Sequence, residues 1–450
     1  MLKAIFGEVK LNNLINYCET LFGMNESVSA FIKNGGTYMF FSIVNRAIPF
    51  LLLPVLTSYI APEGYGVISV FMIIMSISMP LTGLCSNSVL VQKYFKIDDE
   101  QRVYLVNDSY KIMAVMYLIF AVAVFLLQGV LSSWLKISAF WIQIALLSGM
   151  LGMIVTLTNA IMQLKKQAFR FGMFQAVNML LNVCLTVLFV VYLKYSWQGR
   201  LSAIFISYVI VAVIAIAYNF KAEIISFAKM KHSPQLKNII FLGGALIPGT
   251  IAGWAISMSD RLFLTRMTTL EIVGIYSVGV MIAQITDVVL NSISLSYMPF
   301  FYERVYKNEE KTRIRLVQAT YLLALFALLT ALSVYGFASI VINYIVNERF
   351  VKAINVVGFI SLSYALWSIG SLFYNYILAA EKNKIISYVS YATLAANVFA
   401  NYFLVQRYGM IGAAISNTLS SGLFMTLLLL AALKYHPMPW LDKRVLKWKF

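Results

Sequence analysis

Long apolar runs separated by short polar segments fill this chain from residue 37 onward. Each run holds roughly 20 mostly apolar residues, the length that an α-helix needs to cross a bilayer. Twelve such runs cover residues 37–60, 66–91, 111–131, 138–163, 171–193, 201–220, 241–266, 273–299, 318–345, 353–379, 385–405 and 410–433. The pattern predicts an all-α integral membrane protein with about 12 transmembrane helices.

One segment of the first run returns 208 residues later. Leu56–Val70 (LTSYIAPEGYGVISV) aligns without a gap with Leu264–Val278 (LTRMTTLEIVGIYSV), and six of the fifteen positions are identical. An even number of spans separates the two copies, so both halves run in the same direction. The repeat therefore predicts two six-helix lobes related by a pseudo-twofold axis along the membrane normal, with a transport path between them.

The polar segments set the expected domain boundaries. We expect a cytoplasmic or interfacial lead-in without the features of a signal peptide, an N-lobe with spans one to six, a cytoplasmic linker, a C-lobe with spans seven to twelve, and a basic cytoplasmic tail. These parts cover residues 1–36, 37–220, 221–240, 241–433 and 434–450 in that order.

Composition and charge support a membrane location. Hydrophobic residues make up 61% of the chain and charged residues 12%, against about 25% charged residues in average proteins. Of the 35 Lys and Arg residues, 26 fall in the lead-in, the linker, the tail and the alternate loops on the same side. Seven fall in loops on the other side, Arg200 among them, and the remaining two, Arg46 and Arg261, fall inside spans. This asymmetry predicts that both termini are cytoplasmic.

The formal charge of +17 does not indicate a nucleic-acid partner, because no soluble domain is predicted that would shape a binding groove. The basic loops are expected to lie beside anionic membrane lipids instead.

The residue types that carry catalysis or bind metals are sparse. Cys18, Cys85 and Cys184 have no paired spacing, and His232 and His436 are the only histidines, both in cytoplasmic segments. A Walker lysine loop is absent as well. We expect no catalytic residue, no metal site and no cofactor, and hence a protein that is not an enzyme.

Arg46 is the first candidate for substrate binding. It lies nine residues into the first span, about 13 Å along the helix at 1.5 Å per residue, beside Asn45 on a comparatively polar face. A cation at this depth is costly unless it meets a partner, a water-filled cavity or an anionic ligand. A cavity cation for an anionic substrate is the favoured interpretation, and an ion pair with another helix is the alternative.

Asp260 and Arg261 resemble the end of a loop, but the repeat changes their expected depth. The 208-residue offset aligns them with Leu52 and Leu53, which lie deep in the first span. The seventh span should therefore continue to about Arg266. Neighbouring side chains on a helix point about 100° apart, so these two cannot neutralise each other face to face and at least one is expected to reach across the cavity.

A polar stripe in the eighth span supplies three more candidates. Gln284, Asp287 and Asn291 are spaced by three and four residues and so share one helix face. Such a stripe should face the interior, because lipid offers it no hydrogen bonds. Asp287 has three open roles: pairing with an arginine, binding a coupling H⁺ or Na⁺, or joining helices by polar contacts.

Asparagine pairs also recur at a spacing of four in spans five and eleven. They are Asn178 with Asn182 and Asn397 with Asn401. A structural role is favoured for them.

The chain resembles bacterial polysaccharide flippases of the O-antigen transporter type, within the multidrug/oligosaccharidyl-lipid/polysaccharide exporter superfamily. Four segments carry the resemblance over nearly the whole chain: NRAIPFLLLPVLTSYIAPEGYGVISVF in span one, SDRLFL and VGIYSVGVMIAQI in spans seven and eight, YMPFFYE after span eight, and EKNKIISYVSYATLAANVFANYFLVQRYGMIGAAISNTLS in spans ten to twelve.

This resemblance implies a V-shaped pair of lobes around a hydrated, often cationic cavity in the bacterial cytoplasmic (inner) membrane. The implied cargo is an oligosaccharide linked to a polyprenyl diphosphate, which alternating access moves from the cytoplasmic to the periplasmic leaflet. The resemblance also suggests Arg46 as a cavity residue and implies a monomer that works beside polysaccharide polymerase and chain-length proteins. Buried guanidinium groups would lower the cost of moving two phosphates through a low-dielectric slab.

Two rival functions remain at this stage. A cation-coupled multidrug exporter of the same superfamily ranks lower, because cationic drugs favour an acidic cavity and the expected interior has two arginines against two aspartates. A membrane enzyme, such as a polymerase or glycosyltransferase, ranks lower still, because the large outer loop it would need is missing.

Overall fold

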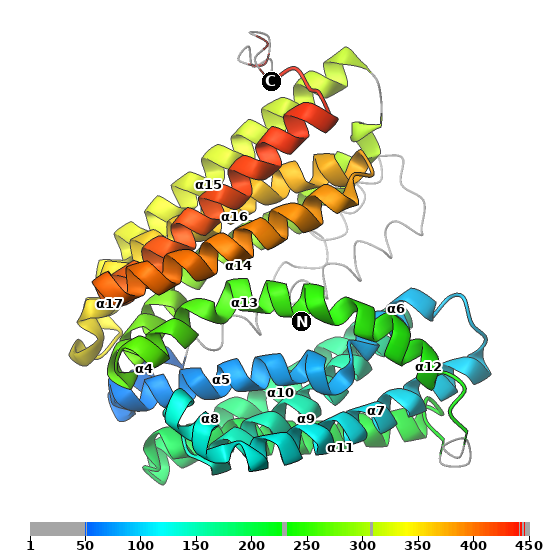
Figure 1. The fold of residues 1–450 in the computed structure, drawn as a ribbon, viewed down its shortest axis with the longest axis vertical. Coiled ribbons are helices and arrows are strands. Elements are labelled where there is room, and N and C mark those ends of the chain that lie inside the picture. The colour runs from blue at the N-terminus through cyan, green and yellow to red at the C-terminus, as the bar shows by residue number, and fades with distance from the viewer. Residues whose placement is uncertain are drawn as a thin grey trace, which may run out of the picture.

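The computed structural model describes residue 50, residues 52–226, 232–306 and 309–440, and residues 442 and 445. All regular structure in this part of the chain is helical (Figure 1), as the apolar pattern predicts. Ten of its helices are long and apolar enough to cross a membrane. The lead-in and most of the first predicted span lie outside the described residues.

The described part of the N-lobe runs from the end of the first predicted span to Lys221. Its helices are α4 (Leu53–Tyr59), α5 (Pro62–Gly83), α6 (Ser86–Lys93), α7 (Asp99–Leu126), α8 (Gln128–Leu135), α9 (Ala139–Leu164), α10 (Ala168–Thr186), the π-helix η1 (Val187–Tyr192) and α11 (Ser196–Lys221).

The predicted span 66–91 is two helices, because the backbone breaks between α5 and α6. Leu84 and Cys85 adopt left-handed backbone conformations, with φ of 43° and 50°. Pro80, one turn earlier, lacks the N–H that would support the last turn of α5.

The C-lobe follows the linker. Its helices are α12 (Leu236–Asn238), the π-helix η3 (Ile239–Gly243), α13 (Gly244–Met267), α14 (Leu270–Val305), α15 (Glu310–Tyr344), the 3₁₀ helix η4 (Glu348–Ala353), α16 (Ile354–Ala379) and α17 (Asn383–Tyr435). Helix α17 contains the predicted spans eleven and twelve. They meet at Gly409, whose φ of 56° and ψ of −130° interrupt the helix and are accessible to glycine at little cost.

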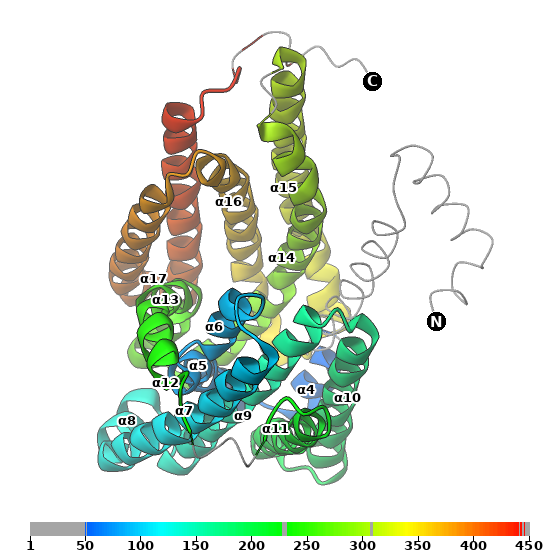
Figure 2. The ribbon, with the colours of Figure 1, turned by 90° about the vertical axis from the view of Figure 1, so that its right-hand side faces the viewer.

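The two lobes share an apolar core at one end. One buried cluster combines N-lobe residues such as Leu56 and Phe71 with C-lobe residues such as Tyr276 and Val357. A second cluster contains residues of the N-lobe and the start of the C-lobe's first span, and a third contains C-lobe residues alone. The lobes are therefore joined at one end, and at the other end only the start of the C-lobe's first span packs on the N-lobe. Figure 1 shows the lobes diverging from the end at α4, and Figure 2 shows the C-lobe helices above the N-lobe helices.

Helix α13 links the lobes. It packs against α17 of the C-lobe and against α5 of the N-lobe, and Figure 1 shows it between the two groups of helices. On the N-lobe side, the Trp254 indole N–H donates to Ser76 Oγ at 2.9 Å. This position brings the charged residues of α13 to the boundary between the lobes.

Candidate functional site

The lobes make their closest backbone contact where α5 crosses α14. A Cβ atom at Gly66 would collide with the carbonyl oxygen of Leu270, and one at Gly274 would collide with that of Pro62. The 208-residue repeat relates the two glycines, Gly66 and Gly274, to each other. It also relates the two residues that supply the carbonyl groups, Pro62 and Leu270. The crossing therefore follows the pseudo-twofold relation that the sequence predicts.

A cavity of about 210 Å³ adjoins this crossing. Residues of α5, α13 and α14 line it: Tyr65, Ile68, Ser69, Met72, Ile73, Met258, Arg261, Ser277, Val280, Met281 and Gln284. Two of the predicted site residues, Arg261 and Gln284, are therefore in its wall. The arginine supplies its charge.

Arg261 makes only weak hydrogen bonds among the described residues, although it interacts electrostatically with the neighbouring Asp260. Its Nη1 donates to Ser257 O at 3.5 Å and approaches Met258 Sδ at 3.1 Å. No carboxylate of the described chain lies within ion-pair distance of it. The guanidinium therefore keeps hydrogen-bonding capacity for an anion in the cavity.

Asp260 points away from this cavity and into the C-lobe. It is 2% exposed. Its Oδ2 accepts from Tyr276 Oη at 2.5 Å and from Asn417 Nδ2 at 2.8 Å, while its Oδ1 accepts from the backbone N–H of Arg261 at 2.7 Å. Arg261 thus lines the interlobe cavity while its neighbour Asp260 bonds to C-lobe side chains, as expected from the angle between adjacent side chains on one helix.

The asparagines of span eleven extend the Asp260 network. Asn397 Nδ2 donates to Asn417 Oδ1 at 3.2 Å, and Asn401 Nδ2 donates to Asn397 Oδ1 at 3.0 Å. Asn401 Oδ1 is buried without a hydrogen-bond partner. A network that holds a buried carboxylate and an unsatisfied carbonyl oxygen contains the kinds of ligand that suit a hard cation or a proton.

The remaining predicted residues are dispersed. Asp287 lies three residues beyond Gln284 on α14 and interacts electrostatically with Tyr364 of α16. Asn291 follows one turn later, and neither of the two is among the residues lining the cavity. Asn45 and Arg46 lie outside the described residues.

The loop position predicted for Arg200 is wrong. Helix α11 begins at Ser196, so Arg200 lies one turn inside it and is largely buried. Its Nη1 donates to Asn182 Oδ1 at 2.8 Å and to Thr186 Oγ1 at 2.6 Å. The residues before 201 are mostly polar, so the apolar pattern alone does not reveal this helix start.

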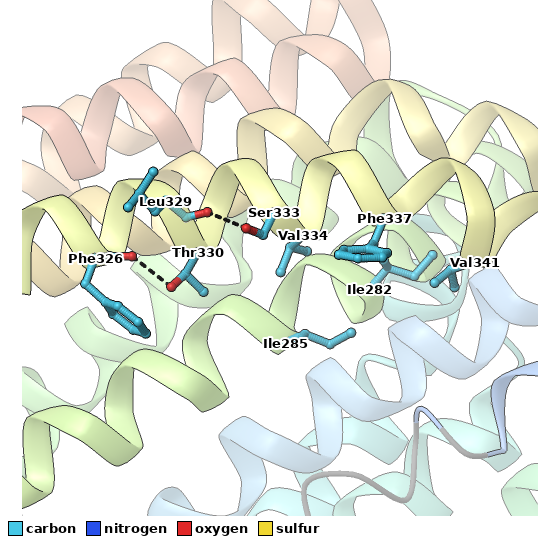
Figure 3. A pocket seen from close by; sticks show the side chains of 9 residues that line it. All are labelled: Ile282, Ile285, Phe326, Leu329, Thr330, Ser333, Val334, Phe337 and Val341. Atoms are coloured by element: carbon cyan, nitrogen blue, oxygen red, sulfur yellow. Dashed lines mark hydrogen bonds between the residues drawn. The ribbon is translucent and has the colours of Figure 1, made fainter.

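A second, larger cavity lies between α14 and α15 and is apolar (Figure 3). It measures about 510 Å³. Its two hydroxyl groups are satisfied within α15: Thr330 Oγ1 donates to Phe326 O and Ser333 Oγ to Leu329 O, both at 2.8 Å. These two hydroxyl groups therefore have no free donor for an anionic ligand.

Comparisons with known proteins agree with this architecture. The model of the polysaccharide biosynthesis protein family matches residues 31–304, more than half of the chain. Lsg locus protein 1 of Haemophilus influenzae is 22% identical over 396 residues, which are 85% of this chain and 94% of that protein. An uncharacterized membrane protein of the same organism is also 22% identical, over 63% of this chain and 68% of its own length.

Two solved structures share the fold. The lipid II flippase MurJ in an inward closed conformation superposes with a TM-score of 0.67 at 10% identity, over 89% of this chain and 87% of that one. An inward-facing multidrug resistance MATE family transporter of the MOP superfamily superposes with a TM-score of 0.64 at 14% identity, over 87% and 96%. The chain is a multi-pass membrane protein with the fold of these transporters, and it belongs to the polysaccharide biosynthesis protein family.

Proposed function

We propose that this protein is a flippase that moves polyprenyl-diphosphate-linked oligosaccharide across the bacterial cytoplasmic membrane by alternating access. The observation that carries the proposal is the Arg261 guanidinium, which faces the interlobe cavity with no carboxylate of the described chain within ion-pair distance. A guanidinium offers a planar fork of donors that matches phosphate oxygens. The MurJ structure, named a lipid II flippase, supports the same class of cargo.

The charge asymmetry of the loops supports the direction of transport. With both termini in the cytoplasm, the crossing of α5 and α14 lies on the outer side. The ends at which the lobes diverge then face the cytoplasm, where the lipid-linked cargo would enter. The basic cytoplasmic segments would bind anionic lipids on the same side and leave the short outer loops for contacts with polymerase or chain-length proteins.

The Asp260 network supports an ion-coupled cycle. Asp260 is buried and is bonded to groups of α13, α14 and α17, so binding or loss of H⁺ or Na⁺ there would alter contacts between helices that border the cavity. A cation in this network would lie behind the Arg261 wall rather than in the substrate path. Coupling and substrate binding are therefore assigned to different residues of one helix.

A leaflet-resolved assay in reconstituted vesicles tests the function. Labelled polyprenyl-diphosphate oligosaccharide in the inner or outer leaflet is quantified with a membrane-impermeant modifying enzyme. Wild-type protein should accelerate translocation, and Arg261→Ala should reduce the rate at least about tenfold, since a charge-assisted hydrogen bond is lost. Arg266→Ala is the matched control, because Arg266 is exposed near the end of the same helix.

The same vesicles test coupling. An imposed Na⁺ or H⁺ gradient should accelerate translocation by wild-type protein and should not affect Asp260→Asn. Wild-type vesicles that leave the cargo in its original leaflet, yet accumulate a cationic dye, would replace the flippase by a multidrug exporter.

A further inference from the structure

The N-lobe encloses an arginine that has no acidic group near it among the residues that the structure describes. Arg200 of α11 donates to the neutral side chains of Asn182 and Thr186 on α10. Helices α9, α10 and α11 and the π-helix η1 contain no Asp or Glu, and the single acid of α5, Glu63, is exposed. A guanidinium inside a membrane lobe is costly without a counter-charge. The described residues around Arg200 supply no such counter-charge.

An unsatisfied donor, the hydroxyl group of Tyr65, lies close to Arg200. Tyr65 is 3% exposed, and its hydroxyl group has no hydrogen-bond partner. Tyr65 and Arg200 are near enough to interact electrostatically. Tyr65 also lines the interlobe cavity, so it connects the arginine to the space that a substrate would occupy.

Each lobe holds one charged side chain in a hydrogen-bond network that includes an asparagine of span five or of its counterpart, span eleven. The two charges are opposite in sign. In the C-lobe, Asp260 is bonded to an asparagine of α17 and belongs to one network with the asparagines of span eleven. In the N-lobe, Arg200 is bonded to Asn182 of the corresponding span five. A site with a carboxylate and amide oxygens suits a cation, and a site with a guanidinium and a phenol suits an oxyanion.

We propose that Arg200 and Tyr65 form an oxyanion subsite that binds a phosphate ester on the N-lobe side of the interlobe cavity. The phosphate has two candidate sources. One is the diphosphate of the cargo, and in that case the inference rests on the proposed function. The other source is the headgroup of an anionic membrane lipid. Both present the same chemistry to the subsite, and an experiment distinguishes them.

The test measures binding to purified protein in nanodiscs of phosphatidylcholine. The ligands are polyprenyl diphosphate, polyprenyl monophosphate and uncharged polyprenol. The variants are Arg200→Met, Arg200→Lys and Tyr65→Phe, each checked for folding by its thermal unfolding temperature. Arg170→Met is the control, because Arg170 is an exposed arginine at the start of α10.

We expect wild-type protein to prefer the diphosphate. Arg200→Met should weaken diphosphate binding about 10- to 100-fold and leave polyprenol binding unchanged. Tyr65→Phe should weaken diphosphate binding about 3- to 10-fold, because it removes one neutral donor and keeps the ring. Arg200→Lys should fall between wild type and Arg200→Met, since it keeps the charge and loses the fork.

A second set of nanodiscs contains phosphatidylglycerol and identifies the source. If this lipid raises the unfolding temperature of wild-type protein but not of Arg200→Met, while diphosphate affinity is equal in both, the subsite holds a lipid phosphate. Equal loss of affinity for all three polyprenyl ligands, with equal responses to phosphatidylglycerol, would overturn the subsite and leave Arg200 as a structural residue.

Failure of the inference is separate from failure of the proposed function. If the protein binds the diphosphate through Arg200 and does not translocate it, the proposed subsite stands and the proposed flippase function is wrong. If wild-type protein translocates the cargo, and Arg200→Met binds the diphosphate with the wild-type affinity, the proposed flippase function stands and the proposed subsite is wrong.

Discussion

Ser69 of α5 and Ser277 of α14 share a hydrogen bond, with their Oγ atoms 2.8 Å apart and 208 residues between them. This is the offset of the internal repeat, so each serine meets its own counterpart from the other half of the chain. A contact between equivalent residues places both near the pseudo-twofold axis. The serine pair also lines the interlobe cavity, and its separation reports whether this side of the transporter is closed.

Cysteines at these two positions should lock the lobes together. In a background without Cys18, Cys85 and Cys184, the pair Ser69→Cys and Ser277→Cys should form a disulfide under mild oxidation, because side chains this close suit its short reach. Translocation in reconstituted vesicles should stop on oxidation and return on reduction. Each single cysteine variant serves as a control and should keep its rate under oxidant. Full transport by the cross-linked protein would show that the crossing does not open.

The glycines of the crossing should be sensitive to the smallest side chain. Gly66→Ala and Gly274→Ala each place a methyl group against a backbone carbonyl, which cannot rotate away. Overpacking of this kind costs about 1–3 kcal/mol, and it falls on the closed arrangement alone. The variants should therefore raise the labelling rate of a cysteine at Ser277 by an impermeant thiol reagent.

Gly253→Ala is the matched control for these substitutions. A Cβ atom at Gly253 meets nothing within 4 Å, and alanine is the better helix former. Its labelling rate should equal that of the parent. Equal labelling of all three alanine variants would mean that glycine at the crossing is not needed for close approach.

The sequence predicts the membrane helices and the two-lobe organisation because both depend on patterns within one segment or between two copies of it. Apolar length alone identifies a span. The repeat then sets the depth of Asp260 and Arg261, and α13 extends to Met267 as that alignment requires. The chemical division between these two residues also follows from helix geometry.

Contacts between distant helices could not be predicted in the same way. Nothing in the spacing of Asn397 and Asn401 indicates that they join the Asp260 network, because the link passes through Asn417 on another span. The apolar pattern begins the sixth span at residue 201, whereas α11 begins at Ser196, and only the packing of α10 against α11 shows that the partners of Arg200 are neutral. Stripe geometry likewise grouped Gln284 with Asp287 and Asn291, although only the first lines the cavity.

Removal of Asp108 should destabilise the N-lobe and release the linker. Asp108 is fully buried on α7. Its Oδ2 accepts from the backbone N–H of Gln235 at 3.0 Å, and its Oδ1 is 3.0 Å from Lys111 Nζ. Asp108→Ala leaves the buried N–H of Gln235 unpaired and removes the counter-ion of Lys111, which keeps its hydrogen bonds to His232 O and Ser233 Oγ. The expected cost is about 1–3 kcal/mol. The readout is the thermal unfolding temperature in detergent.

Asp99→Ala is the control for this substitution, because Asp99 pairs with an arginine on the same helix but is 93% exposed. An exposed pair is worth about 0–1 kcal/mol, so its unfolding temperature should stay close to that of wild type. Limited proteolysis separates the two effects of Asp108→Ala: cleavage should accelerate within residues 221–240 before the helices unfold. A linker that stays resistant while the unfolding temperature falls would mean that Asp108 stabilises α7 alone, and that the start of the C-lobe is held to the N-lobe by α13 instead.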